Sequence, residues 1–201
     1  MSVMTEARLW PIEDRPLTVD DLARTPDDGN RYELVNGVLV VTPAPGFTHQ
    51  LVATRLTALL VLHCTAGFDV VSPVGLNLAP DHHRIPDLAV LRSDQVLPGM
   101  EYPDTPPALV VEVASPSTAK QDRSSKKDEY AAFGIESYWL VTPDRRRPLL
   151  TAYQLSGDCY EPVAVVSGED TFRTDMPFPF SVVPALLVAD NARWTAALPR
   201  G

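Results

Sequence analysis

The sequence has little cysteine and no long apolar run, and each shortage excludes a class of protein. Its 201 residues include two cysteines, Cys64 and Cys159, which are far apart and fit neither a disulfide framework nor a zinc-ligand spacing. No apolar run approaches the roughly 20 residues that cross a bilayer. The segment from Met1 to Trp10 lacks the apolar core of a signal peptide. We therefore expect a soluble, cytoplasmic protein with reduced thiols and no membrane partner.

Positive charge is also scarce. The chain carries 26 Asp and Glu against 17 Lys and Arg, a formal net charge of −9, whereas proteins that coat a nucleic-acid backbone usually carry the opposite sign. Phosphate-loop, dinucleotide-binding, nucleophile-elbow and His-Glu-x-x-His motifs are missing as well, which lowers the rank of those enzyme classes. An enzyme that gathers carboxylates at a metal site, with basic residues beside it, is still compatible with this composition.

The hydrophobic pattern predicts one α/β (α+β) domain with a mixed sheet and helices packed against it. Two strand-like runs around Asn36-Gly37 predict an N-terminal β-hairpin. Apolar residues at helical spacing predict a helix over 48–66, and a second helix is expected over about 119–133. A β-rich tail ends the chain. Strands are expected over 69–78, 85–91, 108–114, 137–141, 149–155, 160–166 and 180–183.

Two carboxylates are the first candidates for chemistry. Glu112 shares one face of an apolar strand with Val110 and Ala114, and an ionised carboxylate there costs free energy unless it is paired or binds a metal. A solvent-exposed strand end, or a buried Glu–Arg pair, would explain it equally well. Asp87 heads the run 85–91, where Asp is often only a turn residue. Neighbouring strands can bring the two carboxylates together, and such a pair is typical of a magnesium site.

The expected second helix carries a local excess of positive charge. Lys126 is spaced four and seven residues before Tyr130 and Phe133, so it shares their inward-facing stripe. Spacing alone favours a solvated helix face whose lysine stems cover the core. The sharper alternative is a lysine that reaches the carboxylates, to orient a water or to stabilise charge on a phosphate. The basic residues beside it, candidates for substrate binding, are Lys120, Arg123 and Lys127.

Other polar groups have ordinary structural explanations. Glu33 lies in the first hairpin strand, where an outward-facing glutamate is common. His49 opens the first helix as a polar cap, and His82-His83 form a loop pair next to Arg84 without a zinc partner at ligand spacing. Arg145–Arg147 form a basic turn that could touch phosphates, although three charges in a turn are usually solvated.

Several short motifs combine into a known pattern. They resemble the PD-(D/E)xK restriction-endonuclease-like superfamily, and within it the small bacterial Uma-two restriction endonucleases. The similarity runs from about Val19 to Pro143, and its most specific stretch is Glu112 to Thr118. The other matching motifs are Arg31 to Leu39, His49-Gln50, Pro86-Asp87, Asp122, Lys126, Tyr130, Gly134 and Tyr138 to Val141.

This resemblance implies a restriction-endonuclease-like fold as a single domain over 1–201. The core would span about 30–143, followed by a β-rich C-terminal extension over about 144–190. The implied activity is that of a divalent-metal-dependent endonuclease that hydrolyses DNA phosphodiester bonds. DNA is the implied partner, and we expect a homodimer.

The resemblance also implies roles for individual residues. Asp87 and Glu112 would hold Mg²⁺ or Mn²⁺, with the Val113 carbonyl and Glu33 as further ligands. In the superfamily a lysine often stands two residues after the second acid, where this chain has an alanine. The family's lysine matches Lys126 on the following helix. Asp87, Glu112 and Lys126 are therefore the implied catalytic residues.

Two non-catalytic alternatives stay open. One is an inactive nuclease-fold module that binds nucleic acid or protein, with no metal at Glu112 and with binding that survives Asp87→Ala. The other is an interaction protein whose β-rich tail mediates dimerisation. Binding of Mg²⁺ or Mn²⁺ discriminates between these alternatives and the nuclease, because neither alternative needs a metal.

Overall fold

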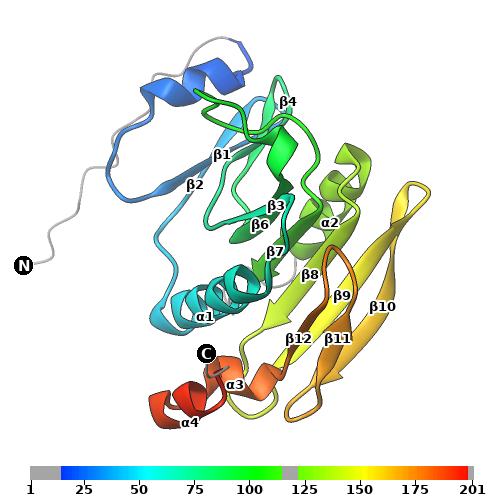
Figure 1. The fold of residues 1–201 in the computed structure, drawn as a ribbon. Coiled ribbons are helices and arrows are strands. Elements are labelled where there is room, and N and C mark those ends of the chain that lie inside the picture. The colour runs from blue at the N-terminus through cyan, green and yellow to red at the C-terminus, as the bar shows by residue number, and fades with distance from the viewer. Residues whose placement is uncertain (1–14, 115–121, 199–201) are drawn as a thin grey trace, which may run out of the picture.

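The computed structural model describes residues 15–114 and 122–198. In this part of the chain the strands form three sheets, and the largest has six strands in the order β10-β9-β8-β7-β6-β3 (Figure 1). Its β7 and β8 run parallel, whereas its other neighbours are antiparallel. The strands are β3 (Phe68–Val71), β6 (Leu88–Arg92), β7 (Leu109–Val113), β8 (Ser137–Thr142), β9 (Leu149–Ser156) and β10 (Cys159–Ser167).

Two smaller sheets and several helices complete the fold. One sheet has the order β2-β1-β5-β4 and the other pairs β11 with β12. The strands of these sheets are β1 (Arg31–Val35), β2 (Val38–Thr42), β4 (Leu76–Ala79), β5 (His82–Arg84), β11 (Phe172–Thr174) and β12 (Phe180–Val182). The α-helices are α1 (Phe47–His63), α2 (Asp122–Phe133), α3 (Pro184–Val188) and α4 (Asn191–Ala196), and the 3-10 helices are η1 (Val19–Arg24) and η2 (Ser93–Gln95). No described helix is long and apolar enough to cross a bilayer.

The central strand β7 separates two hydrophobic cores, as its alternating sequence predicts. Leu109, Val111 and Val113 pack into the core that contains the buried face of α1. Val110 packs on the opposite side of the sheet, with Tyr130 of α2. Because side chains alternate along a strand, Glu112 shares the α2 side with Val110. The two helices thus cover opposite faces of the sheet, and the carboxylate lies on the α2 face.

The mixed sheet, its flanking helices and the N-terminal hairpin are confirmed. The hairpin has Asn36 and Gly37 at φ of 50° and 75°, the left-handed backbone that such a turn requires. Gly37 is needed for a second reason, because a Cβ there would lie 2.5 Å from Cβ of Pro16. The division into a core over 30–143 and an extension over 144–190 stays a prediction, although β9 and β10 continue the same sheet as β8.

Some predicted boundaries are wrong. The expected strand over 69–78 is two strands in different sheets, and the break falls at Pro73, which has no N–H to donate to a ladder. His82-His83 are not a loop pair. They lie in β5, which pairs with β1 and β4, and both side chains are buried in this small sheet. The start of the second helix at about Ala119 lies outside the described residues. The short helices α3 and α4, and β11, were not predicted.

Candidate active site

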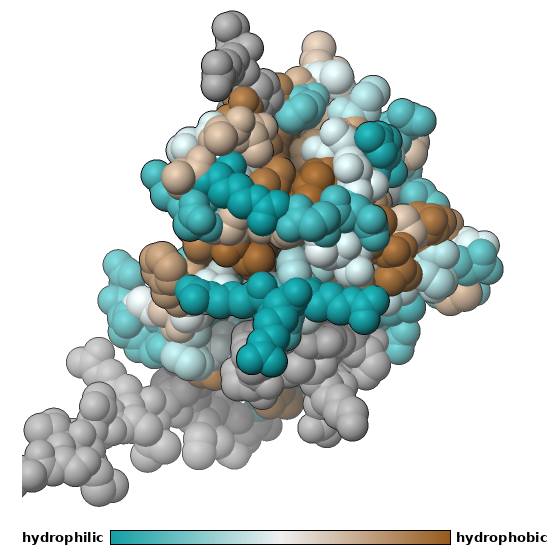
Figure 2. Space-filling view, turned by 90° about the horizontal axis from the view of Figure 1, so that it is seen from below, coloured by the Kyte–Doolittle hydropathy of each residue, from teal (hydrophilic) through white to brown (hydrophobic). Residues whose placement is uncertain are grey.

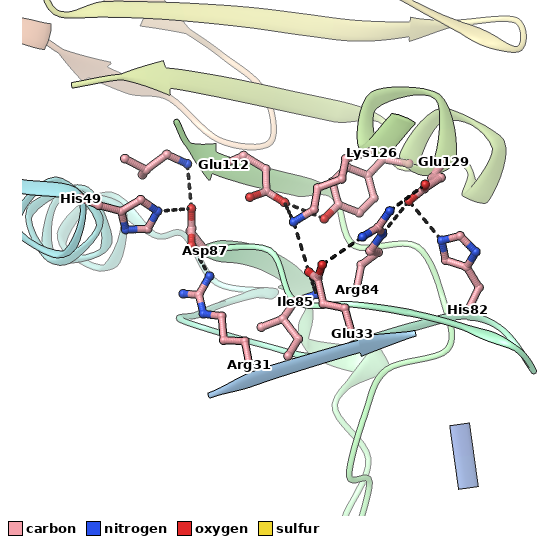
Figure 3. Close-up of polar contacts among 12 residues, drawn as sticks. Arg31, Glu33, His49, His82, Arg84, Ile85, Asp87, Glu112, Lys126 and Glu129 are labelled. Carbon is pink, nitrogen blue, oxygen red and sulfur yellow. Dashed lines mark hydrogen bonds and ion pairs between the residues drawn. The ribbon is translucent and has the colours of Figure 1, made fainter. Parts of the chain in front are cut away.

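Asp87 lies directly before β6, and its carboxylate is buried against three nitrogen groups. Oδ1 accepts a hydrogen bond from Arg31 at 2.9 Å, and Oδ2 accepts one from the Val113 N–H at 2.8 Å (Figure 3). His49 Nε2 lies 2.9 Å from Oδ2. Since these groups come from β1, β7 and α1, the tertiary structure fixes Asp87 beside the carboxyl end of β7.

Glu112 meets two side chains of α2. Lys126 Nζ lies 3.2 Å from its Oε1, and the Tyr130 hydroxyl donates to the same oxygen at 2.7 Å. The two side chains share one helix face because they are four residues apart. Lys126 is 13% exposed, so the solvated face that spacing alone favoured is not what forms. The reach of Lys126 to Glu112 is observed, and its catalytic role stays a prediction.

Glu33 holds Lys126 from the opposite side. Its Oε1 lies 3.1 Å from Lys126 Nζ and accepts the Ile85 N–H at 2.9 Å, while its Oε2 accepts Arg84 Nη1 at 2.9 Å. Its side chain is 7% exposed, so the outward-facing glutamate expected from periodicity is wrong. The small sheet turns this face of β1 toward α2. The role of Glu33 as a metal ligand stays a prediction.

Arg84 links this cluster to a second acid on α2. Its guanidinium donates Nε to Glu129 Oε2 at 2.7 Å and Nη2 to Oε1 at 2.8 Å, in addition to its bond with Glu33. His82 Nε2 lies 3.0 Å from Glu129 Oε2, outside hydrogen-bond geometry. A continuous row of charged groups therefore runs from β5, through α2, to Glu112 in the central sheet (Figure 3).

Sequence reasoning missed several members of this site. Glu129 had a usable signal, because it is three residues from Lys126 and so shares a face of α2 with it. His49 was explained as a polar cap, but the helix begins after Gly46 and the His49 ring instead meets Asp87. Arg84 had no signal, because its two acidic partners lie 51 and 45 residues away in the chain.

The predicted substrate-binding residues are only partly visible. Lys120 lies outside the described residues, and Arg123 lies in α2 with its side chain outside the described part. The Lys127 ammonium lies 4.1 Å from the centre of the Tyr153 ring, a cation–π contact. Substrate binding by these three residues stays a prediction.

Comparisons with known proteins give a family and a fold. The Uma2 family, described as "Putative restriction endonuclease", matches residues 19–189. The chain belongs to this family. A crystal structure described as that of "a putative nuclease belonging to DUF820 from Anabaena variabilis" is similar with a TM-score of 0.66 and 16% identity, over 81% of this chain and 90% of that one. No curated protein matches the sequence.

The acids of this Uma2 protein differ in their protonation. Burial raises the pKa of Glu112 to about 7; the Lys126 charge opposes this shift, and the negative charges of Asp87 and Glu33 add to it. Burial acts in the same direction on Asp87, but contacts with His49, Val113 and Arg31 hold its pKa below the usual value. Glu112 is therefore the acid whose ionised form is least well compensated.

Asp87 and Glu112 of the Uma2 protein are oxygen donors of the kind that a divalent cation prefers, and metal binding there stays a prediction. Each ionised carboxylate offers about four acceptor positions, and the described donors occupy three of those on Asp87. The Val113 carbonyl points to the same side of β7 as its N–H, toward Asp87. A cation there would oppose both the burial and the repulsion by Asp87 and Glu33 that raise the Glu112 pKa. No group of three His, Cys, Asp or Glu side chains suited to a metal occurs within 15–114 and 122–198, so the remaining ligands would be the carbonyl and water.

The raised pKa of Glu112 predicts a pH-dependent stability. Between the unfolded value of 4.5 and about 7 the folded protein binds more protons than the unfolded chain, so stability falls as pH rises through this window. Without metal, we expect each pH unit to cost the wild type up to about 1.4 kcal/mol relative to Glu112→Gln. Urea unfolding from pH 5 to 8, in a chelating buffer, measures this difference.

Comparing the wild type with Glu112→Gln cancels the effect that other titrating groups have on stability. Burial lowers the pKa of His83 to about 4, which produces the opposite slope, but equally in both proteins. Glu136→Gln, at an acid outside the site that pairs with Arg92, serves as the control. Parallel curves for wild type and Glu112→Gln would contradict the prediction.

Proposed function

We propose that this protein is a divalent-metal-dependent endonuclease that hydrolyses DNA phosphodiester bonds. The observation that carries the proposal is the ammonium of Lys126, held between Glu112 and Glu33 at 3.2 and 3.1 Å, on the face of the sheet where Glu112 faces α2. Membership of the Uma2 family supports nuclease chemistry. The acid, acid and lysine come from three separate elements that the fold brings into one region.

In the proposed mechanism, Asp87 and Glu112 would hold Mg²⁺ or Mn²⁺. The bound cation would lower the pKa of a water and polarise the phosphate. Lys126 donates from its ammonium to the attacking water or to the phosphate oxygen on which charge develops. Its contacts with Glu33 and Glu112 keep its pKa raised against the effect of burial, so it stays protonated throughout. Glu33 acts as a positioning residue for Lys126.

Cleavage and metal binding test the proposal together. We expect the wild type to cleave plasmid or single-stranded DNA with Mg²⁺ or Mn²⁺ and to lose this activity in a chelator. We expect Asp87→Asn and Glu112→Gln to remove cleavage and to weaken Mg²⁺ binding at least about tenfold in calorimetry. Glu136→Gln is the matched control. Equal cleavage by all four proteins, or none over a range of substrates and metals, would overturn the proposal.

One observation favours a second candidate. Both oxygens of Asp87 already contact described donors, as expected of a structural carboxylate. The alternative is an inactive nuclease-fold module that binds nucleic acid or protein. It predicts DNA binding that survives Asp87→Ala and no heat on Mg²⁺ titration. The expected homodimer is tested separately by the mass of the protein in solution.

A further inference from the structure

The turn between β8 and β9 presents three consecutive arginines that the proposed chemistry does not use. Arg145, Arg146 and Arg147 are all exposed, and their guanidinium groups make no hydrogen bond or ion pair with any residue that the structure describes. The turn itself has a defined shape. Asp144 Oδ1 accepts the N–H groups of Arg146 and Arg147 at 2.7 and 2.9 Å, which fixes the backbone that carries the three side chains.

The sheet register places this turn on the same edge as the candidate site. β7 and β8 run parallel with Val113 opposite Val141, so the chain after β8 leaves the sheet where β7 ends. The Val113 N–H binds Asp87 at that edge. From strand spacings of about 4.8 Å and about 3.3 Å per residue, the turn lies roughly 10–20 Å from Asp87.

The surface at this end of the molecule carries hydrophilic bands between hydrophobic patches. In Figure 1 the turn lies beyond the lower end of β8, beside α3. Figure 2 looks at the molecule from this side and shows a band of strongly hydrophilic side chains across the face. In a chain with a net charge of −9, three exposed arginines with a single carboxylate, Asp144, in the same turn are a local reversal of sign.

We propose that Arg145–Arg147 bind the phosphate backbone of the nucleic acid on one side of the cleaved bond. The inference rests on the proposed nuclease function and adds the path of its substrate. Phosphates along one strand advance about 3.4 Å per nucleotide, so the turn meets phosphates about three to six nucleotides from the one at Asp87. A planar guanidinium suits this task, because it donates to two phosphate oxygens at once.

The salt dependence of cleavage tests the assignment. The variant Arg145→Gln/Arg146→Gln/Arg147→Gln is compared with the wild type on a DNA duplex of about 30 base pairs, at fixed Mg²⁺ and between about 50 and 200 mM NaCl. We expect its KM to rise roughly 10- to 100-fold, with kcat within about twofold, because the arginines contact substrate away from the reacting bond. The slope of log KM against log salt is expected to fall by about 0.9 for each phosphate that the variant no longer binds.

Two control variants separate the effect of where the arginines lie from the effect of the protein's net charge. Arg92 lies at the end of β6, past the Val90 that pairs with Leu109, so it is at the opposite edge of the sheet. We expect Arg92→Gln to leave KM and the slope unchanged, and Arg145→Lys/Arg146→Lys/Arg147→Lys to retain most of the slope. The three turn arginines are exposed, so thermal unfolding of their variants is expected to match the wild type. Arg92→Gln also loses the surface ion pair with Glu136, whose removal costs at most about 1 kcal/mol.

The outcomes separate this inference from the nuclease proposal. If the variant with glutamine at all three turn positions cleaves with wild-type KM and slope, the arginine assignment is overturned and the nuclease stands. The arginine assignment is also overturned if Arg92→Gln changes the slope as much as the loss of one turn arginine does. The effect would then come from net charge and not from position. A wild type that neither cleaves nor binds DNA overturns both.

Discussion

Replacing Lys126 with methionine is expected to lower kcat roughly 1000-fold, with KM changed less than tenfold. Methionine keeps most of the buried stem but removes the ammonium that lies 3.2 Å from Glu112 and 3.1 Å from Glu33. The loss falls on kcat because the charge stabilises the transition state more than the bound substrate. Single-turnover cleavage of a labelled DNA at saturating Mg²⁺ measures the effect.

A second readout distinguishes chemistry from support of the fold. The Lys126 charge opposes the raised pKa of Glu112, so its removal is expected to move the acid limb of the pH–rate profile to higher pH. Lys126→Arg keeps the charge on a wider group and is expected to restore part of kcat and the original profile. Arg92→Met, at the opposite edge of the sheet, is the control. A Lys126→Met protein within tenfold of wild-type kcat would remove Lys126 from the mechanism.

Replacing Arg84 with methionine is expected to lower the free energy of unfolding by about 3–5 kcal/mol. The Arg84 side chain is 4% exposed and binds two acids, Glu129 through two nitrogens and Glu33 through the third. Its removal leaves both carboxylates with too little compensation in a region that water barely reaches. Urea unfolding of the metal-free protein at pH 7 measures the loss.

A double-mutant cycle identifies the cause. Arg84→Met combined with Glu129→Met removes both members of the bidentate pair, so the double variant is expected to be more stable than the sum of the single losses predicts. Glu136→Gln provides a surface acid for comparison. A loss below about 1 kcal/mol for Arg84→Met would show that the two acids find other partners or protonate. In that case Glu33 would not depend on Arg84 to position Lys126.

The position of Glu112 illustrates how far local sequence carries the prediction. Alternation along β7 put Glu112 on the face of Val110, and helical spacing put Lys126 with Tyr130 on one side of α2. Both statements hold because they depend on periods of two and about 3.6 residues, which neighbouring residues impose. Sequence spacing does not show that this face of β7 and this side of α2 are packed against each other. Spacing alone therefore favoured a solvated lysine.

Asp87 illustrates the opposite case. Its three contacts, with Arg31, His49 and Val113, come from β1, α1 and β7, and sequence patterns do not encode such distances. Arg84 is similar, because nothing in a run of three polar residues shows that a small sheet buries them. The local explanations of His49 as a cap and of His82-His83 as a loop failed because packing outweighed local preference. Asp87 does lie in a bend before β6, but its buried contacts come from distant parts of the chain.

The sequence by itself determined the elements that alternate or repeat with a clear period: the hairpin at Asn36-Gly37, the helix expected over 48–66 and found over 47–63, the apolar central strand, and the face on which Glu112 lies. Family motifs added the acids and the lysine. Only the tertiary structure decided which charged groups meet, namely the row from Glu129 through Arg84 and Glu33 to Lys126 and Glu112. The physical reason is that periodicity comes from the local backbone, whereas ion pairs in a low-dielectric interior depend on distances that only the packed chain sets.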